Sequence, residues 1–113
     1  MTIDKQTSGE ATILKVSGEI DLHASPDLRE ALHLCIEEKK PIVLVDFSEV
    51  DYIDSSGLAT LIEYARESTP TGGKFGLFGL QKKVRAIFDL VRLNELFVIE
   101  ATADEALASI AVK

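Results

Sequence analysis

The residues best suited to chemistry lie together in the segment Asp54-Ser55-Ser56-Gly57, where an apolar strand pattern passes into a helical one. Asp54 is a good N-cap residue, because its carboxylate can accept hydrogen bonds from the N–H groups of a first helical turn. Those N–H groups and the helix dipole also make a helix start a natural place for a phosphate. Gly57 costs about 1 kcal/mol relative to alanine within a helix, which suggests that something approaches the chain closely there. A phosphate-bearing serine fits this pattern, but an ordinarily capped helix start is the better interpretation from the residues alone.

The spacing of the helix that follows does not decide between the two serines. Its apolar stripe predicts one buried face, made of Leu58, Leu61, Ile62 and Ala65. At about 100° per residue, Ser56 projects nearly opposite the centre of that stripe and Ser55 lies at its edge. Because a first-turn residue need not follow helical periodicity, the spacing favours Ser56 without excluding Ser55.

Other chemistries lack the residues that they need. His23 and His33 are too few and too isolated for a metal site. Ser55 has neither the G-x-S-x-G turn of a hydrolase nor an evident histidine partner. Asp46 ends an apolar strand, as in a receiver domain, but the acidic pair and the lysine that complete a receiver site are missing, so the loop acids are interpreted as solvated. Residues 71–74 lack the frame of a phosphate-binding loop and enter a strand. We therefore expect no catalytic residue, no cofactor and no metal.

Composition and charge narrow the class of protein further. The chain has 113 residues, 46% hydrophobic and 27% charged, which fits a single globular domain over residues 1–113. No apolar run is long enough to span a bilayer and no signal peptide is evident, so a cytoplasmic location is expected. Residues 1–57 hold twelve acidic and five basic residues, whereas residues 58–113 hold seven of each, which accounts for the net charge of −7. This charge disfavours nucleic acid and anionic membrane; it either suits a basic protein partner or simply keeps the domain in solution.

Apolar periodicity places strands and helices in alternation along the chain. Strands are expected near Ile3, at Thr12–Ile20, at Ile42–Phe47, at Phe75–Gly79 and around Phe97–Glu100. Helices are expected after Ser25-Pro26, with serine as the cap and proline at the first position, from about Ser55 to Glu67, around Val84–Val91, and after Thr102, where T-x-x-E forms a capping box. Alternating strands and helices predict an α/β fold with parallel strand pairs. We expect a mixed sheet of four or five strands with helices packed on it.

Three further motifs share their order with a known family. Ser17-Gly18-Glu19-Ile20-Asp21 resembles a G-E-[LI]-D loop, residues 84–90 and 93–97 resemble a third-helix pattern, and residues 104–107 read Asp-Glu-Ala-Leu. Together with Asp54-Ser55-Ser56-Gly57-Leu58, they resemble the bacterial anti-sigma factor antagonists, which are STAS domains. The similarity covers nearly the whole chain; one departure is Gly79-Leu80-Gln81, where members often begin the helix with Ser-Pro.

The resemblance implies a partner-switching role. In the family, a serine-protein kinase that is also the anti-sigma factor phosphorylates the first serine after the aspartate, which here is Ser55. The unphosphorylated form would bind the kinase and release the sigma factor, and a separate serine phosphatase would reset the switch. The residues implied in partner binding are Asp21, Asp54, Ser56 and Gly57, with Gly57 letting the partner approach the helix start.

Two other functions remain open at this level. A STAS module that only scaffolds, in a stress-sensing assembly or beside a membrane transporter, would use Ser55 as a helix cap without a phosphate cycle. An enzyme is the least supported, because no nucleophile–base pair or cofactor loop is evident. The retained Asp54-Ser55-Ser56-Gly57 motif favours the antagonist.

Overall fold

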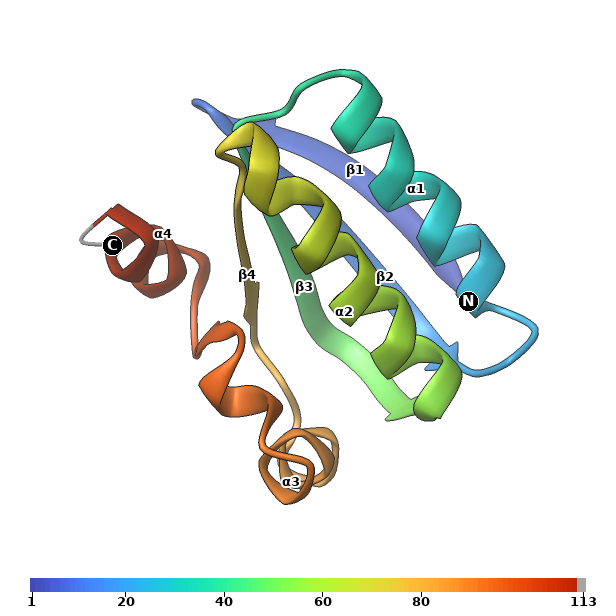
Figure 1. The fold of residues 1–113 in the computed structure, drawn as a ribbon. Helices are drawn as coiled ribbons and strands as arrows, with labels where there is room; N and C mark the ends of the chain where they lie inside the picture. The colour runs from blue at the N-terminus through green and yellow to red at the C-terminus, as the bar shows by residue number, and fades with distance from the viewer. Residues whose placement is uncertain (112–113) are drawn as a thin grey trace.

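A single mixed sheet organises the chain (Figure 1). The computed structural model describes residues 1–111, and their side chains apart from those of Thr71 and Ala111. The sheet order is β1-β2-β3-β4-β5. The strands are β1 Thr2–Ser8, β2 Ala11–Ile20, β3 Ile42–Ile53, β4 Lys74–Phe78 and β5 Val98–Glu100. The helices are α1 Ser25–Glu37, α2 Ser55–Ser68, α3 Lys82–Leu90 and α4 Ala103–Ala111, with short 3₁₀ turns at Thr69–Thr71 and Leu93–Glu95. The predicted α/β fold is confirmed, with five strands in a mixed sheet where four or five were expected.

The direction of the strands follows from their connections. β1 and β2 form an antiparallel hairpin, in which Ser8 pairs with Ala11 and Gly9 turns the chain at φ 60°. The pairs β2–β3, β3–β4 and β4–β5 are parallel, because each is joined by a crossover that contains a helix. The early hairpin therefore supplies the antiparallel edge that the sequence allowed.

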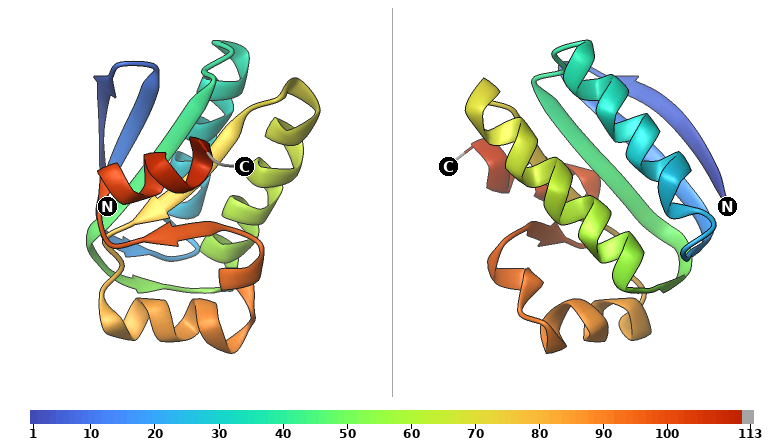
Figure 2. Two further views of the ribbon diagram at one scale, coloured as in Figure 1. Left: turned by 90° about the vertical axis from the view of Figure 1, so that its left-hand side faces the viewer. Right: turned by 45° about the vertical axis from the view of Figure 1, so that its right-hand side comes forward.

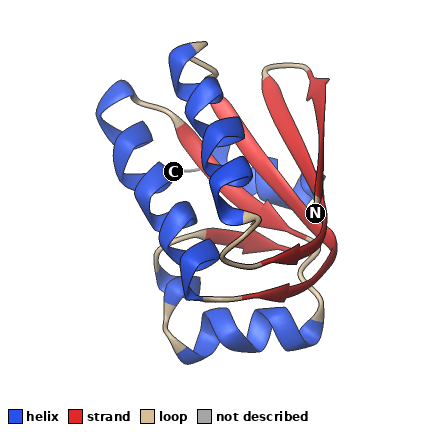
Figure 3. Ribbon diagram, turned by 90° about the vertical axis from the view of Figure 1, so that its right-hand side faces the viewer, coloured by secondary structure: helices blue, strands red, loops and turns tan. Residues whose placement is uncertain are grey.

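Helices cover both faces of the sheet. α1 and α2 lie side by side on one face, and α4 lies on the other (Figures 1 and 2). α3 packs across one end of the sheet, where Figure 3 shows the helix lengthwise below the strands. The alternation of β3 matches this arrangement, since Val43 and Val45 join the core under α1 and α2 while Leu44 packs against Ala106 and Ile110 of α4. β3 is thus the buried central strand that its continuous apolar run predicts.

Three local predictions need correction. Ser25 is buried within the first helix and does not cap it; the N-cap position is Ala24, which has no side-chain cap. β3 runs on past Phe47 to Ile53, because it stays paired with β2 across two register shifts. The helix expected around Val84–Val91 is α3, which ends at Leu90, so Val91 follows it and is 50% exposed. The capping box at Thr102 is confirmed, with the Glu105 N–H donating to Thr102 Oγ1 at 3.2 Å.

No helix in the described part of the chain has both the length and the apolar character needed to cross a bilayer.

Candidate functional site

The segment that carries Ser55 lies where two neighbouring parallel strands end. Ile20 and Ile53 are paired at the carboxyl ends of β2 and β3. The loop after β2 carries Asp21, and the junction after β3 carries Asp54. The Asp54 N–H donates to the Ile20 carbonyl at 3.1 Å, which joins the two connections directly. Residues more than thirty positions apart in sequence are thereby brought to one edge of the sheet.

Asp54 is the N-cap of α2, as the sequence predicts. Its Oδ1 accepts hydrogen bonds from the N–H groups of Ser56 at 2.9 Å and Gly57 at 3.2 Å. The hydroxyl of Ser56 also donates to Asp54 Oδ1, at 2.6 Å. The pKa of the Asp54 carboxyl is lowered, first by this hydroxyl and then by the backbone N–H groups of Gly57, Ser56 and Leu22. The carboxylate therefore stays charged at neutral pH, and it already occupies first-turn N–H groups that a phosphate would otherwise use.

The two serines differ in what their hydroxyls do. Ser55 is exposed, and within residues 1–111 its hydroxyl takes part in no hydrogen bond. Ser56 is half-buried and its hydroxyl is held by Asp54. Ser55 is the serine whose oxygen an incoming group can reach.

The expectation that Ser56 projects outward was wrong, because the buried face of α2 had been misplaced. Its buried residues are centred one position earlier than the aliphatic stripe suggests, on Gly57, Thr60, Leu61, Tyr64 and Ser68. Leu58, Ile62 and Ala65 are only half-buried at the margins. Measured from the true centre, Ser55 points nearly opposite the core and Ser56 lies at the edge.

Packing within the domain explains why position 57 is a glycine. It is buried, and a Cβ at this position would lie 2.7 Å from Ile20 Cγ2, 2.7 Å from Ile53 Cγ1 and 3.1 Å from the Ile20 carbonyl oxygen. The close approach that this glycine implies is thus made by the ends of β2 and β3. The glycine is therefore explained by packing within the fold, and its role toward a partner stays a prediction.

Asp21 organises the loop between β2 and α1. Its Oδ1 accepts hydrogen bonds from the N–H groups of His23 at 3.1 Å and Ala24 at 3.0 Å, and its carbonyl accepts from Ser25 at 2.8 Å. The backbone N–H of the next residue, Leu22, also helps to lower the pKa of Asp54. Together with the bond from the Asp54 N–H to the Ile20 carbonyl, this places the loop of Asp21 beside the start of α2.

Two exposed apolar side chains flank this edge and were not singled out in the sequence. Leu22 is 69% exposed and Tyr52 is 46% exposed. Their exposure depends on the β2–α1 loop and on the extension of β3, neither of which a residue pattern specifies. Apolar groups beside a polar helix start are what a protein interface commonly contains.

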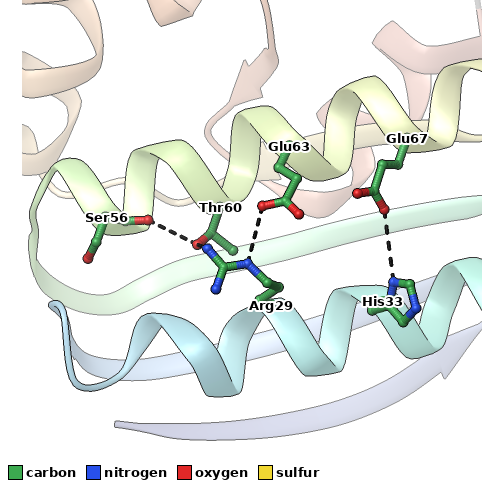
Figure 4. Close-up of polar contacts among 6 residues, drawn as sticks. All are labelled: Arg29, His33, Ser56, Thr60, Glu63 and Glu67. Atoms are coloured by element: carbon green, nitrogen blue, oxygen red, sulfur yellow. Dashed lines mark hydrogen bonds and ion pairs between the residues drawn. The ribbon is translucent and has the colours of Figure 1, made fainter.

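The first turn of α2 is tied to α1 through side chains (Figure 4). Thr60 Oγ1 donates to the carbonyl of Ser56 at 2.9 Å and accepts from Arg29 Nη2 of α1 at 3.4 Å. Arg29 Nε also pairs with Glu63 at 3.2 Å. These contacts hold the backbone next to Ser55 in register with the neighbouring helix. Among the described residues, no group of three or more histidine, cysteine, aspartate or glutamate side chains could hold a metal ion.

Comparison with known proteins identifies the family. The STAS domain family model matches residues 2–106, which is most of the chain. This chain belongs to the STAS domain family. The arrangement described above, with the serine segment at the start of α2 beside the β2–α1 loop, is therefore a site on a STAS domain.

Several relatives are named for one role. An "anti-sigma-B factor antagonist" of Listeria monocytogenes is 28% identical over 90 residues, covering 80% of this chain and 79% of the relative. One from Bacillus subtilis is 25% identical over 104 residues, covering 92% of this chain and 94% of the relative. The crystal structure of an anti-sigma factor antagonist from Mycobacterium paratuberculosis aligns with a TM-score of 0.88 at 26% identity, over 97% of this chain and 93% of that one. Members with these names are regulatory binding proteins.

Proposed function

We propose that this STAS domain is an anti-sigma factor antagonist that is switched by phosphorylation of Ser55. The unphosphorylated protein binds a serine-protein kinase that is also the anti-sigma factor, and so releases the sigma factor. Phosphorylation by that kinase ends the binding, and a serine phosphatase restores it. The cycle runs in the cytoplasm, and all 113 residues act as one domain.

One observation favours Ser55 over Ser56 as the phosphorylation site. Of the two adjacent serines at the start of α2, Ser55 has the exposed hydroxyl without an intramolecular hydrogen bond, whereas the Ser56 hydroxyl is held by Asp54 at 2.6 Å. A kinase must bring the acceptor oxygen into line with the γ-phosphate of ATP, so a free hydroxyl facing solvent is the better acceptor. The domain supplies this hydroxyl, while ATP, magnesium and the acid–base groups belong to the kinase.

Local charge supports phosphorylation as the off state. A phosphoserine adds about −1.5 to −2 charges at neutral pH. Next to it, the Asp54 carboxylate remains ionised because its pKa is lowered by the Ser56 hydroxyl and the first-turn N–H groups. Since these donors are already used, the added charge faces outward, where the exposed Leu22 and Tyr52 would contact a partner. A doubly charged group between apolar contacts must be desolvated on binding, and this weakens the complex.

The proposal is tested by incubating the protein with ATP and each serine kinase encoded near its gene, and locating phosphate by mass spectrometry. Modification is expected at Ser55 and is expected to be absent from Ser55→Ala. Binding of the kinase is then compared for the wild type, Ser55→Ala, Ser55→Asp and a control, Ser8→Asp. The control makes the same charge change at the exposed last residue of β1, which pairs with the start of β2 and so lies at the other end of that strand from Ile20.

Only Ser55→Asp is expected to lose binding. Phosphate on Ser56 alone would refute the site assignment. Equal binding by Ser55→Ala and Ser55→Asp would show that charge at this position is not the switch. Absence of modification with every candidate kinase would favour a scaffold without a phosphate cycle.

A further inference from the structure

A second surface feature lies at the far end of α2 from Ser55. A groove of about 590 Å³ opens between the last turn of α2, the start of β4, the segment before β5, and α4. Its apolar wall consists of Ala65, Phe75, Leu96, Phe97, Val98 and Ile110. Leu96 is 56% exposed, so part of this wall faces solvent. The volume lies in the range of roughly 300–1,000 Å³ that is usual for small-molecule sites.

The polar side of this groove is cationic. Arg66 comes from the last turn of α2, and Lys74 from the first residue of β4. Lys74 Nζ donates to the Ile110 carbonyl at 3.3 Å, which directs its charge toward the groove and α4. Among the described lining residues there is no aspartate or glutamate.

The two cations of this groove have no counter-ion within the described residues 1–111. Lys5, Arg29, Arg85 and Arg92 are each paired with a carboxylate, whereas within residues 1–111 Arg66 and Lys74, like several surface lysines, have no such pair. On a chain with a net charge of −7, an apolar groove with two unpaired cations is a local reversal of charge.

We propose that this groove binds a medium-chain fatty-acid anion. The acyl chain lies against the wall formed by Phe75, Leu96 and Phe97, and the carboxylate is placed between the side chains of Arg66 and Lys74. Burial of the chain supplies the main driving force, and the two cations select an anionic head group. The opposite end of α2 is roughly 20 Å away at 1.5 Å per residue, so an occupied groove leaves Ser55 free.

The groove between α1 and α2 provides an internal contrast. It has about 470 Å³ and an apolar floor, but three glutamates, Glu30, Glu63 and Glu67, line it. Its arginine, Arg29, is already paired with Glu63, and His33 lies beside Glu67. An anionic head group is repelled there. The sign of the lining charge therefore favours the groove of Arg66 and Lys74 over the groove between α1 and α2. The hollow beside Lys39 and Lys40 is also cationic, but at about 250 Å³ it is less than half as large.

The test is an NMR titration of the ¹⁵N-labelled full chain with decanoate, decanol and decylamine, each below its micelle-forming concentration. Decanoate is expected to shift amides around residues 65–75, 96–98 and 110, and to bind at least tenfold more tightly than decanol or decylamine. The variant Arg66→Glu/Lys74→Glu is expected to weaken decanoate binding at least tenfold. Its matched control is Lys82→Glu/Lys83→Glu, the same charge change at exposed residues of α3; it is expected to bind as the wild type does.

Absence of decanoate binding, equal binding of decanol, shifts that map to the groove between α1 and α2, or an equal loss in both charge-reversed variants would each overturn the proposal. The four substituted residues are exposed, and the amide spectrum itself shows that each variant is folded.

Discussion

Replacing Gly57 by alanine separates two explanations of why a glycine stands at this position: tight packing against the ends of β2 and β3, or room for a partner. In an open helix start, Gly57→Ala stabilises the helix by about 1 kcal/mol. Here the new Cβ would lie 2.7 Å from Ile20 Cγ2 and from Ile53 Cγ1, about 0.7 Å inside the 3.4 Å at which ordinary contact begins. Overpacking of this kind costs about 1–3 kcal/mol. We take about 3 kcal/mol, because two side chains and a backbone oxygen are compressed together, and this leaves a net loss of about 2 kcal/mol.

The assay is denaturant unfolding supported by thermal melting, where the loss corresponds to a fall in Tm of about 8 °C for a domain of this size. Ser55→Ala is the control in the same turn and is expected to stay within about 0.5 kcal/mol of the wild type, because that residue is exposed. Combining Gly57→Ala with Ile53→Ala removes one of the clashing carbons, so the two losses should fall short of additive by about 1–2 kcal/mol. If Gly57→Ala is instead as stable as the wild type, or more so, the packing argument is wrong and room for a partner is again the better explanation.

Three further outcomes follow from the start of α2. Ser56→Ala is expected to raise the pKa of Asp54 toward its ordinary value of 3.8, because the Ser56 hydroxyl is the largest cause of the lowering; carboxyl-carbon NMR against pH measures it, and an unchanged pKa would contradict the assignment. A carboxyl whose pKa is lowered in the folded state stabilises the fold above its unfolded-state pKa, and this contribution is lost as the pH falls through the folded-state pKa. The pH-dependent part of the difference in unfolding free energy between wild type and Ser56→Ala should therefore disappear in acid. Thr60→Val is expected to cost about 1 kcal/mol, because it removes a buried hydroxyl and its bond to the Ser56 carbonyl. Arg29→Ala removes an exposed ion pair with Glu63 and a long bond of 3.4 Å to Thr60, and should cost less than about 1 kcal/mol in urea unfolding. The reverse ranking would count against this reasoning. Phosphorylation of Ser55 should shift amide resonances only near residues 20–24 and 52–58, and changes spread over the sheet would show instead that the switch acts by refolding.

Sequence reasoning succeeded where one residue's neighbours are close in sequence. The capping box at Thr102 and Glu105 and the cap at Asp54 depend on contacts two or three residues apart, and both are present. The apolar run in β3 is also a local signal. A strand without polar alternation must be covered on both faces, so this run predicted a central strand. Local patterns therefore specified the elements and the position of the serine segment within them.

The errors arose where distant segments decide the outcome. Ser25 has the usual chemistry of a cap, but the β2–α1 loop is turned by Asp21 and brings Ala24 to the cap position. In α2, Gly57 and Thr60 were not counted in the buried face, because small or polar residues carry no apolar signal. They are buried because the ends of β2 and β3 and the side chain of Arg29 lie against them.

The occupied cap at Asp54 bears on how a phosphate at Ser55 would act. In an empty helix start, first-turn N–H groups bind phosphate and neutralise part of its charge. Here the N–H groups of Ser56 and Gly57 donate to Asp54, and the N–H of Leu58 donates to the Asp54 carbonyl at 3.0 Å. A phosphate at Ser55 therefore meets a carboxylate and few free donors, so its charge remains uncompensated within the domain. The electrostatic cost of that charge would then fall on the partner surface that binds over Ser55, so the proposed release of the partner would need no change in the fold.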